Sequence, residues 1–122
     1  MNLPKRRHIQ RLESVWIKKP VYFPTFCAAG RKPTFSRPVS AGILTQALHD
    51  APGIHGWLVG RFVIRPDHIL LFCTAASDEK TLSAFITDWK RWTARQMEQA
   101  THIAPPIWQT EFFDHVLRSA TS

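Results

Sequence analysis

A short hairpin in the middle of the chain constrains the fold more than any other sequence feature. Two strand-like apolar runs, residues 55–64 and 68–74, are separated only by Arg65, Pro66 and Asp67. Three intervening residues that include proline and aspartate are typical of a tight turn between antiparallel strands. Because segments with helical spacing flank this hairpin, the sheet must combine antiparallel pairing with helical connections.

The flanking segments predict one short helix and one long helix. Before the hairpin, residues 41–49 repeat apolar side chains at helical intervals, Ser40 could cap them, and residues 50–53 interrupt the pattern with proline and glycine. After the hairpin, Ser77 or Asp78 is expected to cap a helix that runs to about residue 99. Its apolar side chains fall within one arc about 140° wide: Leu82, Phe85, Ile86, Trp89, Trp92 and Met97.

Two further extended segments complete the pattern. Residues 21–27 are rich in β-branched and aromatic side chains, and Pro24 within them favours an edge position or a bulge. Residues 107–117 read as a final extended segment with an aromatic cluster. The resulting order, β-α-β-β-α-β without a glycine-rich phosphate loop, predicts an α+β ferredoxin-like fold. In that fold two helices pack on one face of an antiparallel sheet.

Positive charge is concentrated at the N-terminus. Sixteen Lys and Arg residues against nine Asp and Glu give a net charge of +7, which favours a polyanionic partner such as nucleic acid. Residues 1–20 contain six basic residues and one acidic residue, whereas the other 102 residues contain ten and eight. We therefore expect a basic N-terminal arm at residues 1–19 and a folded domain at residues 20–122.

The compartment is predicted from what the sequence does not contain. No apolar run approaches the ~18 residues of a membrane span, and no apolar stretch follows the first basic residues as in a signal peptide. Cys27 and Cys73 lack the spacing of metal ligands and are expected to be buried thiols. These features predict a cytoplasmic protein without a membrane partner.

Three segments in sequence order resemble the REP-associated tyrosine transposases, the single-tyrosine branch of the HUH endonuclease superfamily. The first is VYFPTFC at residues 21–27 with GRKP at residues 30–33. The second is IRPDHILLF at residues 64–72, similar to the family's M-P-N-H-V-H-L-L stretch. The third is WQTEFFDHVLR at residues 108–118, similar to W-Q-x-x-F-Y-D-H-V-I-R. The resemblance implies that residues 20–122 form a transposase-like HUH-fold domain.

The resemblance also implies a chemistry that this chain carries only in part. In the family, two histidines of the second segment bind a divalent metal, and a tyrosine on a later helix attacks a DNA phosphate. The first histidine matches His68, but the second falls on Leu70, and the only tyrosine is Tyr22 in the first strand. The chain ends at Ser122, before the family's catalytic helix. We therefore predict no catalytic residue and no cofactor, unless a Mg²⁺ or Mn²⁺ site persists at His68.

DNA is the partner that the resemblance and the charge favour. Basic or aromatic side chains that could contact phosphates or bases are Lys5, Arg6, Arg7, Arg31, Lys32, Arg65, Lys90, Arg91, Arg95 and Trp108. For the three helical cations a solvated helix surface is the simpler alternative, and for Trp108 the alternative is packing in the core.

Three functions stay open at this point. The first is a transposase-like DNA-binding protein without catalytic activity that recognises single-stranded or hairpin DNA. The second is an active transposase or single-strand endonuclease whose missing parts come from another residue or chain. The third is a folded relic or protein-interaction module without DNA affinity. Because the wider family includes dimers, a homodimer is a further candidate assembly.

Overall fold

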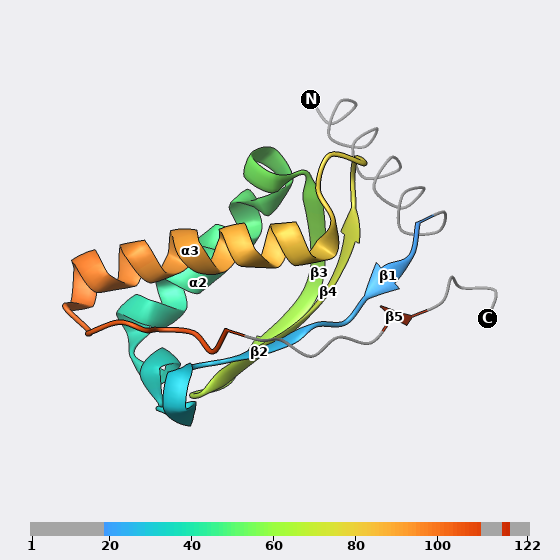
Figure 1. Cartoon of the computed structure of the whole chain (residues 1–122). Coiled ribbons are helices and arrows are strands. Elements are labelled where there is room, and N and C mark those ends of the chain that lie inside the picture. The colour runs from blue at the N-terminus through green and yellow to red at the C-terminus, as the bar shows by residue number, and fades with distance from the viewer. Residues whose placement is uncertain (1–18, 111–115, 118–122) are drawn as a thin grey trace, which may run out of the picture.

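A computed structural model describes residues 19–110 and 116–117 of the protein (Figure 1). Its elements are β1 (Val21–Tyr22), β2 (Thr25–Cys27), the 3-10 turns η1 (Ala29–Arg31) and η2 (Thr34–Ser36), α2 (Pro38–His55), β3 (Trp57–Ile64), β4 (His68–Ala75), α3 (Leu82–Thr101) and β5 (Val116–Leu117). No helix in this part of the chain is long and apolar enough to cross a membrane.

The first strand of the sheet is interrupted by a proline but keeps its register. Tyr22 in β1 lies opposite Cys73, and Thr25 in β2 lies opposite Leu70, so the pairing with β4 does not shift between them. Pro24 has no N–H to donate, but its carbonyl accepts a hydrogen bond from the Leu71 N–H at 3.3 Å. The predicted strand at residues 21–27 is therefore one strand in two segments, and of the two alternatives expected at Pro24, an edge position or a bulge, the bulge does not form.

The sheet has the strand order of a ferredoxin-like fold. β4 lies between β3 on one side and β1 and β2 on the other, and β5 pairs with β1. Every pairing is antiparallel, and counting β1 with β2 as one strand gives the order β5, β1/β2, β4, β3. Both α2 and α3 lie on the same side of this sheet (Figure 1). The predicted α+β class with two helices on one face is confirmed.

The central hairpin forms as the sequence predicts, except that β3 begins at Trp57 rather than at residue 55 and contains one irregularity. The turn between β3 and β4 is closed by a hydrogen bond from the Arg65 N–H to the His68 carbonyl at 2.8 Å. The register shifts between Val59 and Phe62, so β3 carries one extra residue at a β-bulge near Gly60. This bulge lies opposite Phe72, between the pairs Val59–Cys73 and Phe62–Leu71.

The first described helix is twice as long as predicted. α2 runs from Pro38 to His55 rather than over residues 41–49. Pro38 is tolerated in the first turn, where a backbone N–H has no partner within the helix. Pro52 lies in the last turn, and Gly56 ends the helix in the left-handed conformation, with its N–H donating to the Pro52 carbonyl at 3.2 Å. The prediction that residues 50–53 end the helix is wrong because a proline so close to the C-terminus removes only one hydrogen bond.

The long helix starts later than the sequence suggested. α3 begins at Leu82, and the Thr81 hydroxyl caps it by accepting a hydrogen bond from the Ala84 N–H at 3.1 Å. The helix ends at Thr101, followed by His102 in the left-handed conformation. The predicted caps Ser77 and Asp78 therefore belong to the preceding loop, because the threonine satisfies the first turn instead.

Aromatic side chains fill the space between the helices and the sheet. Trp57 and Phe85 stack with ring centroids 5.2 Å apart, and Phe26 meets Trp89 edge-on at 5.4 Å. The final extended segment is only partly described: Trp108 forms a bridge with Ala28, residues 116–117 form β5, and residues 111–115 lie outside the described residues.

Candidate nucleic-acid interface

Two loops meet at one end of the sheet and form a single surface. The loop after β2 is joined to the β3–β4 turn by hydrogen bonds from the Ala28 N–H to the Asp67 carbonyl at 2.8 Å and from the Phe35 N–H to the Pro66 carbonyl at 2.9 Å. The Arg31 Nε also donates to the Asp67 Oδ2 at 2.8 Å. These contacts bring together the basic positions that the sequence places far apart, 31–32 and 65.

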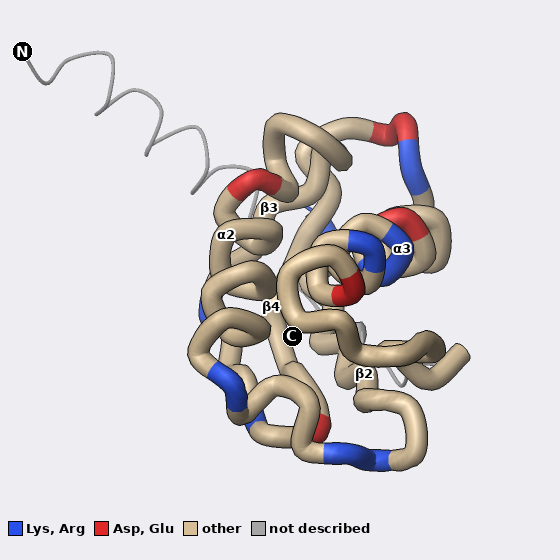
Figure 2. The backbone as a smooth tube through the Cα atoms, turned by 90° about the vertical axis from the view of Figure 1, so that its left-hand side faces the viewer, with Lys and Arg blue, Asp and Glu red and all other residues tan. Residues whose placement is uncertain are grey.

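This surface is strongly basic. Arg31, Lys32, Arg37 and Arg65 are all exposed here, and we call them the loop-end cluster. Within residues 28–37 and 65–68, Asp67 is the only acidic residue. Figure 2 shows the contrast: the lower end of the tube carries several blue segments and one red segment, while most red segments lie elsewhere.

Asp67 remains a carboxylate at this surface. Hydrogen bonds from His68 and Arg31 hold the pKa of Asp67 below its usual value. The same hydrogen bond, with the attraction of the carboxylate, raises the pKa of Arg31. Asp67 thus offsets one of four positive charges, and a net positive charge remains for an anionic partner.

At His68 the described residues do not match the divalent metal that the sequence resemblance implies. The His68 Nδ1 lies 2.8 Å from the Asp67 Oδ1, and Leu70, two residues along β4, occupies the same sheet face without a donor atom. The residue paired with His68 across the sheet is the buried Cys27. Among residues 19–110 and 116–117, no group of three His, Cys, Asp or Glu side chains could hold a metal ion. Mg²⁺ and Mn²⁺ need several oxygen ligands, so these residues do not match that group.

Lys90 is not available to DNA, and this prediction is wrong. The residue is only 8% exposed, its Nζ donates to the Gln109 carbonyl at 2.9 Å, and it lies 5.8 Å from the centroid of the Phe26 ring. Burial lowers the pKa of Lys90 to about 8. Lys90 lies at the margin of the apolar arc of α3, and the segment around Trp108 and Gln109 covers that margin.

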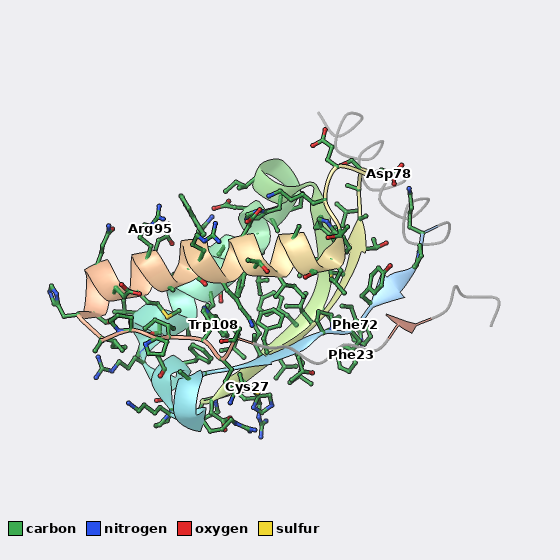
Figure 3. The ribbon with its side chains drawn as sticks, in the orientation of Figure 1. Phe23, Cys27, Phe72, Asp78, Arg95 and Trp108 are labelled. Carbon is green, nitrogen blue, oxygen red and sulfur yellow. The ribbon has the colours of Figure 1, made fainter. Side chains whose placement is uncertain are left out.

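Trp108 is also a core residue rather than a base-stacking one. It is 7% exposed, its indole N–H donates to the Thr93 hydroxyl at 3.0 Å, and its ring lies 4.7 Å from Phe35 and 5.6 Å from Trp89. In Figure 3 its side chain lies between α3 and the sheet. The alternative of core packing is therefore correct.

Arg91 and Arg95 form a second basic surface, on the solvent side of α3. They flank Trp92, which the helical arc predicted to be buried but which is 40% exposed. Together with His55 and Asp88, these three side chains line a hollow of about 210 Å³. Figure 3 shows Arg95 and Cys27 on opposite sides of the molecule, so this surface is separate from the loop-end cluster.

The electrostatics of this hollow favour an anion. Asp88 is engaged by Lys80 at 2.8 Å, and no ion pair of Arg91 or Arg95 with another described residue is present. Burial and the neighbouring Lys80 lower the pKa of His55, so His55 stays neutral near pH 7.

The sequence predicted both arginines as candidate contacts, but it did not indicate Trp92 or Arg37 as part of either surface. For Arg37, the concentration of basic residues between Arg31 and Arg37 is the sequence pattern that could have indicated it.

The remaining candidates lie elsewhere. Lys5, Arg6 and Arg7 lie outside the described residues. Tyr22 points to the helix side of the sheet, with its ring centroid 5.8 Å from that of Trp57, whereas His68 lies on the other face. The structure therefore separates the one tyrosine from the one matching histidine.

Comparison with solved structures shows the fold shared with transposases. The REP-associated tyrosine transposase bound to a REP hairpin superposes with a TM-score of 0.67 at 18% identity, over 86% of this chain and 60% of that one. A Deinococcus radiodurans protein provisionally described as a transposase gives a TM-score of 0.72 at 21% identity, over 86% of this chain and 84% of that one. No family model matches the sequence, and no curated protein matches it. The resemblance seen in the sequence thus agrees with the fold, and the chain spans about 60% of the length of the hairpin-bound transposase.

Proposed function

We propose that this protein is a transposase-like DNA-binding protein that recognises single-stranded or hairpin DNA and does not cleave it. The observation that carries the proposal is the loop-end cluster, which gathers four exposed cations around a single carboxylate. Phosphate contacts of this kind supply most of the affinity of proteins for nucleic acid. The neighbour of the same fold bound to a REP hairpin supports hairpin DNA as the first ligand to test.

The local chemistry supports the proposed absence of cleavage. Leu70 occupies the place of the second family histidine, and Tyr22 packs against Trp57 on the opposite face from His68. A phosphotyrosine intermediate needs a nucleophile within reach of the phosphate that is activated. Tyr22 does not meet that requirement within this chain.

Binding is tested by fluorescence anisotropy with a DNA hairpin that carries a single-stranded flank, against duplex and scrambled controls, over a salt series. Replacing Lys32 and Arg65 together by alanine should lower the salt slope by roughly 0.7 per lost contact, because each phosphate contact releases counterions. Lys19→Ala is the control, since Lys19 pairs with Asp78 at the other end of the sheet. An unchanged slope in the double variant would refute the assignment of the cluster.

The two alternatives correspond to other results of the same experiments. Nicking of the hairpin with Mn²⁺ or Mg²⁺ at high protein concentration would mean that another residue or chain completes an active site. No binding to any DNA would leave a relic or a protein-interaction module. A preference for the hairpin that survives near-physiological salt is the expected result.

A further inference from the structure

The sheet face away from the helices carries a pair of stacked aromatic rings. The constant register of β1, β2 and β4 places Phe23 opposite Phe72. Their ring centroids are 4.5 Å apart and their planes differ by 16°. Both side chains are partly exposed, and in Figure 3 they lie on the side of the sheet opposite α3. Because the two rings stack on each other, each keeps one outer face on which another planar ring can stack.

A hollow lies beside these rings because of the bulge in β3. Val21, Gly60, Arg61 and Phe72 line a cavity of about 260 Å³. The extra residue of the bulge opposes Phe72, and Gly60 brings no side chain over that ring. Arg61 is exposed at the rim of the hollow. The hollow therefore combines an apolar, aromatic wall with a single positive charge.

The charge around this face selects an anionic occupant. The strand segments β1 to β4 contain no aspartate or glutamate. Arg61 lies on β3 and Arg65 directly follows it. Arg31 of the loop-end cluster contacts Asp67, which also lies within hydrogen-bond distance of His68 on this face. A second copy of the chain on this face would place these arginines close to the same arginines of the first copy, and the like charges would repel each other. A single nucleic-acid strand supplies both phosphates and flat bases.

We propose that Phe23 and Phe72 form a base-stacking platform for unpaired nucleotides of a DNA strand whose phosphates are held by Arg61 and the loop-end cluster. The proposal rests on the DNA-binding function proposed above and extends it to a new surface. Phe72 lies four residues from His68 along β4, about 13 Å, so one strand can contact both places. Aromatic side chains on open antiparallel sheets are used in this way by other single-strand-binding domains.

The test uses Phe23→Leu and Phe72→Leu, which keep apolar volume but remove the flat rings. Phe62→Leu is the matched control, because it makes the same exchange on β3 but on the face packed against the core. Thermal unfolding of each variant establishes that it is folded. The probes are a labelled oligothymidylate without secondary structure and the same oligonucleotide with abasic sites, measured by anisotropy over a salt series.

The platform predicts a loss of roughly 5- to 100-fold in affinity for oligothymidylate in the double variant, with an unchanged salt slope. Binding of the abasic oligonucleotide should change little. Equal affinity of wild type and double variant, or equal loss on both probes, overturns the platform while leaving DNA binding intact. A wild type that binds no DNA overturns the proposed function as well. A dimer in light scattering that Phe72→Leu converts to a monomer would assign this face to self-association and overturn the platform.

Discussion

Lys90 gives the most quantitative prediction, because an ammonium group is buried where the sequence predicted an exposed one. The residue is 8% exposed, and burial lowers its pKa from 10.5 to about 8. A lowered lysine pKa means that the unfolded chain binds more protons than the folded one between about pH 8 and 10.5. The free energy of unfolding should therefore rise with pH across this window.

The size of the effect follows from the shift. Each pKa unit corresponds to about 1.4 kcal/mol, so the full penalty of the charged lysine at neutral pH is about 3 kcal/mol. Raising the pH from about 7.5 to about 10 should relieve about 2 kcal/mol of this penalty. In a Lys90→Met variant this contribution disappears, and its stability should depend less steeply on pH by that amount.

The assay is urea denaturation of wild type, Lys90→Met and Lys32→Met at several pH values between these limits. Lys32 is exposed, so Lys32→Met removes a lysine without relieving any burial and serves as the control. The lost hydrogen bond to the Gln109 carbonyl lowers the stability of Lys90→Met at every pH, so the comparison uses the change with pH and not the absolute stability. Parallel curves for wild type and Lys90→Met would refute the reasoning. Lys90→Met should also leave the salt slope of DNA binding unchanged.

Three further predictions concern stability and charge. Gly56→Ala should destabilise the protein by about 1 kcal/mol or more, because Gly56 has φ of 71° and an added Cβ would meet the Ser77 hydroxyl at 3.0 Å. Gly53→Ala, in the helix with open space around it, should instead be neutral or stabilising in the same thermal unfolding experiment. Trp108→Phe should lower the free energy of unfolding by about 1 to 3 kcal/mol through the lost bond to Thr93 and lost packing, yet leave DNA affinity per folded molecule unchanged. In an NMR titration the Asp67 carboxyl should protonate below its usual pH, and Arg31→Ala should move that midpoint upward; an unmoved midpoint would show that the ion pair does not form in solution.

Most of the fold could be predicted because it rests on local patterns. The hairpin turn at residues 65–67 and the apolar spacing of α3 are both encoded within a few residues. Helix ends were less predictable, since Pro52 and Thr81 act through their position within a turn rather than through residue type alone. The distinction between Lys90 and Lys32 could not be predicted, because only the segment around Gln109, distant along the chain, buries one of them.

The candidate sites depended still more on tertiary structure. Arg31 and Asp67 are 36 residues apart and meet only when two loops close on each other. The angular position of Trp92 on α3 places it in the apolar arc, but the spacing of residues does not show how far the neighbouring elements extend over that arc. The stacking of Phe23 on Phe72 needs the register between two strands, which a hydrophobic pattern alone does not fix.

The bulge in β3 has a consequence for the behaviour of the protein at high concentration. In the described part of the sheet, β3 pairs only with β4, so its other side is a free edge of eight residues, Trp57–Ile64. Straight free edges are templates for strand addition and fibrous aggregation. The extra residue at Gly60 twists this edge, and the neighbouring Arg61 places charge on it. The irregularity that opens a hollow beside Phe72 therefore also hinders copies of the chain from pairing along this edge. Deleting Gly60 should straighten the edge and remove that protection.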